Sequence, residues 1–161
     1  MSNVSEQAVI NLTIADYANV DNGGKANLVG VGGGIIPLTP TGLTTRFSVF
    51  AEIRIPGSLC PCEMTVEYSL RNASGSVVEL AGPVPQPVRV ANIVTVESVA
   101  ELNLEQKNHI GGRSMNALDF ANGMPLSPGD YQFRVTIDGD DAHAAYVNFC
   151  VPEQAPNPVL G

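Results

Sequence analysis

Two of the three cysteines in this chain, Cys60 and Cys62, are separated by one proline, and the third, Cys150, lies far along the sequence. Three thiolates could bind zinc, whose tetrahedral sites take a fourth ligand, for which the histidines are the candidates. The Cys60–Cys62 pair could also be redox-active. However, Cys62 falls on the inward face of an alternating segment, whereas Cys150 points away from the core. We therefore expect three structural thiols.

The two histidines, His109 and His143, are far apart, and no local pattern connects either of them to a serine or cysteine nucleophile. A hydrolase of the α/β type would carry its serine in a G-x-S-x-G turn, and the sequence has no such turn. The sequence therefore supports no catalytic triad.

Three aspartates, Asp138, Asp140 and Asp141, gather at the tip of an expected hairpin. They could bind calcium weakly, but the run lacks the spacing of a calcium loop and its glutamate at the twelfth position. A solvated turn is the favoured interpretation.

The glycine-rich run at residues 30–34 invites comparison with a nucleotide-binding loop. A dinucleotide fingerprint would need another glycine where Ile35 stands and a helix where Pro37 stands. Gly24-Lys25 is followed by alanine rather than by the hydroxyl residue that would hold magnesium. These glycines are typical of turns. We therefore predict no catalytic, cofactor-binding or metal-binding residues, no cofactor and no enzymatic activity.

Composition narrows the choice of partners. The 161-residue chain has 8 basic and 16 acidic residues and a net charge of −8, which disfavours direct binding to a nucleic-acid backbone. No apolar run approaches the roughly 18 residues of a membrane-spanning helix. The N-terminus lacks the features of a signal peptide and the cysteine count is odd, so we expect a cytoplasmic site of synthesis.

Period-2 alternation runs through most of the sequence and predicts antiparallel β-structure. The clearest case is the end of the chain, where two alternating segments flank Asp138-Gly139, a typical hairpin turn. Tyr131 follows Gly129 at the start of this hairpin, which is the place of a tyrosine corner in sandwich domains. The other expected strands are residues 8–14, 26–31, 45–55, 62–70, 76–80, 88–99 and 115–120.

The sequence thus predicts an all-β fold, an antiparallel, immunoglobulin-like β-sandwich of eight or nine short strands, over residues 8–151. The polar residues 1–7 and the Pro-rich residues 152–161 are expected to be extended N- and C-terminal arms. The prolines at 83–87 predict a connector at an edge of the sheet or outside it. The segment 101–107 could be either a helical turn or an extended arm.

Three motifs together resemble a family of uncharacterised single-domain β-sandwich proteins of actinobacteria and other bacteria. In that family an L-A-D-x-A segment leads to a G-K-L…G strand, and a P-G-x-Y…I-D-G hairpin closes the fold. The matching segments of this chain are residues 14–20, 24–30, 126–131 and 136–139. The resemblance covers roughly residues 10–55 and 115–151 and implies a sandwich without assigned activity; a phage-borne member would fit it. Ala26 and the Cys60-Pro61-Cys62 turn depart from the pattern.

Two functions are expected from these features. The first is a non-enzymatic structural virion protein, a phage capsid decoration or accessory protein, because small acidic sandwiches without catalytic residues commonly have that role. Its partners would be the major capsid protein or copies of itself, bound through the terminal arms. The alternative is a soluble bacterial binding module for a protein or a small ligand, using residues 32–42 and 100–114. Neither function involves direct contact with nucleic acid or membrane.

Overall fold

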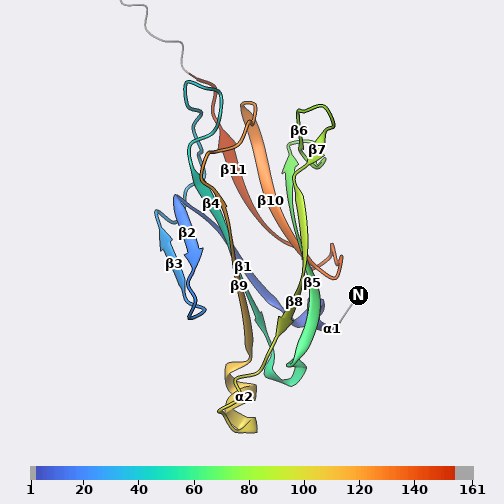
Figure 1. The fold of residues 1–161 in the computed structure, drawn as a ribbon. Helices are drawn as coiled ribbons and strands as arrows, with labels where there is room; N and C mark the ends of the chain where they lie inside the picture. Colours follow the sequence, from blue (N-terminus) through green and yellow to red (C-terminus); the bar gives the residue numbers. More distant parts are fainter. Residues whose placement is uncertain (1–2, 155–161) are drawn as a thin grey trace, which may run out of the picture.

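The computed structural model describes residues 3–154, which form two antiparallel sheets packed face to face (Figure 1). The three-stranded sheet has the order β1 (Val9–Ala15), β4 (Phe47–Ile55), β9 (Gly112–Phe120). The four-stranded sheet has the order β11 (Ala145–Val151), β10 (Gly129–Ile137), β5 (Cys62–Asn72), β8 (Arg89–Val96). The predicted antiparallel, immunoglobulin-like sandwich is confirmed.

Smaller elements surround this sandwich. They are the β2 (Tyr17–Val20) and β3 (Ala26–Val29) hairpin, the short pair β6 (Glu79–Leu80) and β7 (Gln86–Pro87), the helices α1 (Asn3–Gln7) and α2 (Leu104–Ile110), and the 3-10 turn η1 (Gly57–Leu59). The described chain therefore has eleven strands, more than the eight or nine predicted. The difference arises because β2 was not recognised and because β7 pairs within the Pro-rich connector.

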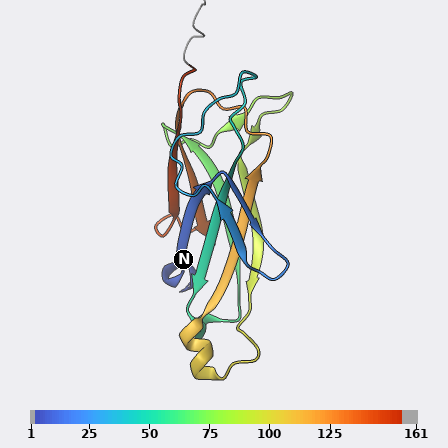
Figure 2. The same ribbon diagram turned by 90° about the vertical axis from the view of Figure 1, so that its left-hand side faces the viewer.

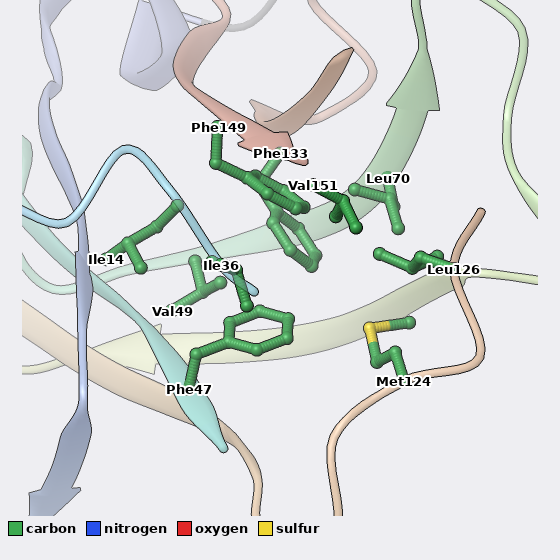
Figure 3. Packing of buried hydrophobic residues seen from close by; sticks show 10 residues of the cluster. All are labelled: Ile14, Ile36, Phe47, Val49, Leu70, Met124, Leu126, Phe133, Phe149 and Val151. Carbon is green, nitrogen blue, oxygen red and sulfur yellow. The ribbon is translucent and has the colours of Figure 1, made fainter. Parts of the chain in front are cut away.

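The core fills the space between the two sheets. The inward residues expected on the central strand β4 are all buried: Phe47, Val49, Ala51, Ile53 and Ile55. Phe133 and Phe149 meet Phe47 from the opposite sheet, with ring centroids 6.3 Å and 5.8 Å away (Figure 3). Aromatic pairs at such distances stabilise the packing beyond the area that they bury.

The closing hairpin also follows the sequence prediction. Asp138 and Gly139 have φ angles of 51° and 72°, and the Asp140 N–H donates to the Ile137 carbonyl at 2.9 Å, as in a type I′ turn. The chain then runs through residues 138–144 before β11 begins, so the connection is longer than a two-residue hairpin. At the other end, the Tyr131 hydroxyl donates to the Ser127 carbonyl at 2.7 Å, so the tyrosine corner is confirmed.

The N-terminal segment differs from the predicted extended arm. Residues 3–7 form the helical turn α1, and Ser5 is only 3% exposed. Val4 and Ala8, which lie on one side of a helical turn, pack against the core, and burial of these apolar groups folds the segment onto the sandwich. Part of the predicted C-terminal arm, residues 155–161, lies outside the described residues.

The tyrosine corner should contribute measurably to stability. We expect Tyr131→Phe to lower the free energy of unfolding by about 1 kcal/mol, because it removes one hydrogen bond while keeping the ring. Urea unfolding followed by circular dichroism measures this, with Tyr146→Phe as the control, since Tyr146 is 61% exposed. An equal effect of both substitutions would show that the hydrogen bond of the corner adds no more stability than an exposed tyrosine hydroxyl.

Candidate functional site

The three cysteines do not form one site. The thiols of Cys60 and Cys62 lie within reach of each other, and burial raises the pKa of both, which makes them weak nucleophiles at neutral pH. Cys150 pairs with Asp130 near the opposite end of the four-stranded sheet. Cys62 begins the 11-residue strand β5 and Cys150 lies near its end, so roughly 30 Å separates them. Among residues 3–154 no group of three or more His, Cys, Asp or Glu could hold a metal ion.

The two histidines are also separated. His109 lies on α2, whereas His143 lies in the β10–β11 connection, where it contacts one of the three clustered aspartates. The His143 Nδ1 is 2.9 Å from the Asp140 Oδ2, and the Ser5 hydroxyl donates to that same oxygen at 2.8 Å. The structure thus brings together a serine, an aspartate and a histidine that the sequence did not connect.

The order of these groups decides what they can do. In a catalytic triad the imidazole stands between the serine and the carboxylate, so that it can accept the proton of the serine hydroxyl. Here the Asp140 carboxylate stands between Ser5 and His143, and Ser5 is buried. A carboxylate in this position fixes two neighbours and does not activate a nucleophile. The network therefore connects α1 to the β10–β11 connection.

The three aspartates were expected to form a solvated turn, and this expectation is wrong for Asp140. Asp138 and Asp141 are exposed, but Asp140 is only 6% exposed. The hydrogen bonds from His143 and Ser5 lower the pKa of Asp140 to about 2. The sequence could not reveal this contact, because Ser5 and Asp140 are 135 residues apart. Near Ser5 the sequence carries one weak signal, the spacing of Val4 and Ala8, which extends over a single helical turn and does not identify a helix by itself.

The glycine-rich segment behaves as the expected turn. The chain enters it at Gly30, where a side chain would collide with the carboxyl group of Asp16. The Asp16 N–H also donates to the Gly30 carbonyl at 3.2 Å. Asp16 and Gly30 are thus in direct contact, although they lie in separate segments of the sequence.

The α2 helix forms the end of the molecule where the chain crosses from β8 to β9 (Figure 2). Its N-terminus has a capping box, in which the Asn103 side chain accepts from the Gln106 N–H at 2.9 Å and the Gln106 side chain accepts in return from the Asn103 N–H. Its backbone lies directly against η1, because a side chain at Gly57 would overlap the Lys107 carbonyl. The ambiguous segment 101–107 is thus resolved in favour of a helix.

The helix α2 buries none of its own residues. Leu104 is 75% exposed and Ile110 is 62% exposed, and Val99, just before the helix, is 46% exposed. We call Val99, Leu104 and Ile110 the α2 apolar set. A seven-residue helix is too short to be stable alone in water, so its cap and its contact with η1 hold it. This end of the sandwich is the candidate functional site.

The network around Asp140 should give the fold a specific acid sensitivity. Because folding lowers the pKa of Asp140, the unfolded chain takes up this proton first as the pH falls. The stabilisation is therefore complete above the ordinary value of 3.8 and is lost as the pH falls towards about 2. We expect Asp140→Asn to lower the Tm at neutral pH and to flatten the Tm profile in that range.

Asp141→Asn is the matched control, since the Asp141 side chain is 71% exposed and its ion pair with Arg134 contributes little. Thermal unfolding at a series of pH values measures both variants. If both variants retain the profile of the unsubstituted protein, Asp140 has no stabilising role.

Among residues 3–154 no helix is long and apolar enough to cross a membrane. No protein-family model matches the sequence, and a search of curated proteins finds no match either. The resemblance to the bacterial family stays a prediction.

Solved structures with a similar arrangement include the CARDB domain of a Pyrococcus furiosus protein in complex with di-metal ions (8% identity, TM-score 0.48, 94% of each chain). A β-glucosidase from Listeria innocua in complex with gluconolactone also matches (10% identity, TM-score 0.44), and 92% of this chain corresponds to 17% of the glucosidase. The DNA glycosylase AlkC of Pseudomonas fluorescens matches with 12% identity and a TM-score of 0.41, over 88% of this chain and 30% of AlkC. These similarities are too low to transfer a ligand or an activity.

Proposed function

We propose that this chain is a non-enzymatic interaction protein that binds a partner protein through the α2 end of its sandwich. One observation carries the proposal: α2 is held firmly by its cap and by η1, yet its apolar side chains lie in solvent. Full burial of one leucine or isoleucine side chain contributes about 1.5–3 kcal/mol, so covering the α2 apolar set would supply substantial binding energy.

The helix is suited to this role because it is already formed. A segment that folds only on binding loses part of the interaction energy to ordering, whereas a preformed contact surface avoids that cost. The capping box and the contact at Gly57 order α2 without any partner. The partner surface that fits it is an apolar depression that accepts Leu104 and Ile110.

The capsid accessory role is one form of this proposal, with the capsid protein as partner. The bacterial binding module is the other form, with a cellular protein as partner. In both forms the contact surface differs from the N-terminal arm expected from the sequence, because residues 3–7 fold against the sandwich and Ser5 is buried. The proposed contact surface at α2 lies within residues 100–114, the segment that was expected from the sequence to form a binding surface.

Site-specific photo-crosslinking tests the proposal in the cells where the protein is made. A photoreactive residue at position 104 should give one defined product with a partner protein, which mass spectrometry identifies. The same residue at position 146, which is 61% exposed on β11, should not give that product. Crosslinking to the capsid protein favours the virion form, and crosslinking to a cellular protein favours the binding-module form.

Binding of the purified partner to the full chain then measures the contribution of α2. We expect Leu104→Ser to raise the Kd at least about tenfold, as for a side chain at the centre of an interface. Gly57→Ala, which pushes α2 away from η1, should also weaken binding. Gly82→Ala is its control, because a side chain at Gly82 would make only an ordinary contact, 3.4 Å from the Val84 carbonyl. Equal crosslinking from positions 104 and 146, or an unchanged Kd for Leu104→Ser, would contradict the proposal.

A further inference from the structure

The four-stranded sheet ends in a long strand whose outer edge is open. β8 is the last strand in the order β11-β10-β5-β8, and it pairs with β5 in unbroken register from Arg89 to Val96. Proteins usually protect such an edge with a lysine, a proline or a bulge, because its free backbone groups can pair with another chain. Residues 90–96 contain no proline and no charged residue.

The opposite edge of the same sheet is covered. The Ile36 N–H donates to the Cys150 carbonyl at 2.9 Å, and the Cys150 N–H donates to the Gly34 carbonyl at 2.8 Å. Residues 34–36 thus occupy the outer edge of β11. Within residues 3–154 we find no comparable backbone bond to the outer edge of β8.

The backbone pattern shows which groups of β8 face outward. The Leu70 N–H donates to the Val88 carbonyl at 3.0 Å, so the backbone of Val88 is turned towards β5. Because successive residues of a strand turn their N–H and C=O groups to opposite sides, the even-numbered residues of β8 bond to β5. The odd-numbered residues turn their backbone groups away from the sheet: Arg89, Ala91, Ile93 and Thr95.

We propose that this edge binds β8 of a second copy of the chain, in an antiparallel register centred on Ile93. This register places Ile93 opposite Ile93 of the second copy and Ala91 opposite Thr95. All of these residues present outward backbone groups, so both strands donate and accept along the shared edge. The result is one continuous sheet through two molecules, an interaction that goes beyond the partner binding proposed for α2.

Charge complementarity selects this register and this occupant. With Ile93 at the centre, Arg89 of each copy lies opposite Glu97 of the other, because Arg89 is four residues before Ile93 and Glu97 four residues after it. A shift of two residues in either direction removes both charge pairs. Arg89 already donates to Glu67 at 2.6 Å, but a guanidinium has five N–H donors and can serve a second carboxylate.

The pairing also covers apolar side chains. Ile93 is 71% exposed on the outer face of the sheet, and Val90 is 45% exposed on the inner face. In the proposed register Val90 lies opposite Val96 of the second copy, so each valine extends the apolar inner face of the other. Cross-strand pairs of β-branched residues stabilise a sheet by roughly 0.2–1 kcal/mol each.

Sedimentation equilibrium of the full chain over a dilution series tests the proposal. We expect a reversible dimer. Glu97→Arg places two arginines opposite each other at both ends and should weaken the dimer by about tenfold or more. Arg89→Glu places two glutamates opposite each other at both ends and should weaken the dimer to a similar extent. Glu101→Arg, an exposed residue outside β8 with the same charge change, should leave the dimer intact.

Mixing the two weakened variants gives the sharpest result. The Glu97→Arg chain carries two arginines at the edge and the Arg89→Glu chain carries two glutamates, so a mixed dimer regains complementary charges at both ends. We expect the 1:1 mixture to dimerise more strongly than either variant alone. Ala91→Pro removes one outward N–H without touching a bond to β5, so it should abolish the dimer while circular dichroism shows an intact fold.

Three outcomes would overturn the proposal. They are a monomer at every concentration of the unsubstituted protein, a dimer that Glu97→Arg leaves unchanged, and a mixture that dimerises no better than its components. A monomer whose β8 edge is occupied by a strand of another protein gives the first outcome and so also overturns it.

Discussion

The packing of Phe47 between the two sheets is the interaction on which the rest of this structure depends. Its ring lies 4.9 Å from that of Phe120 on the neighbouring strand and 5.8 Å from that of Phe149 on the opposite sheet. Phe133 completes the contact from β10. Because these residues lie on four strands from both sheets, their mutual burial fixes the face-to-face arrangement. The tyrosine corner and the network around Asp140 then secure the two ends of β10.

This arrangement also determines which parts of the molecule are left exposed and able to bind other molecules. The two sheets bury their facing sides against each other. The described residues whose side chains could react or bind a metal are either far apart or enclosed by hydrogen bonds. Cys62 and Cys150 lie near opposite ends of the sheet, and Asp140 is hydrogen-bonded between Ser5 and His143. The features that the core does not use are the α2 apolar set at one end and the open edge of β8. The first feature suits contact with a partner protein, and the second suits pairing with another copy of this chain.

The strands could be predicted from the sequence because their information is local. Alternation on β4 and β10 identifies the buried side chains, and Gly129 with Tyr131 identifies the corner. The helix α1, the contact between Ser5 and Asp140 and the position of α2 against η1 could not be predicted. Each of them depends on residues far apart in the chain, and none leaves a periodic pattern longer than one helical turn. The exposed state of Leu104 and Ile110 is likewise invisible in a sequence, where apolar residues are normally assigned to the core.

Hydrogen exchange measured by NMR at two protein concentrations tests most directly the claim that this sandwich works through its uncovered surfaces. The amides of Ala91, Ile93 and Thr95 point outward from β8, so they should exchange quickly in dilute solution and become protected as the concentration rises. The inward amides of Asn92 and Val94, which bond to β5, should be protected at both concentrations. Fast exchange of the outward amides at both concentrations would contradict the account, because it would show that the edge stays open to solvent.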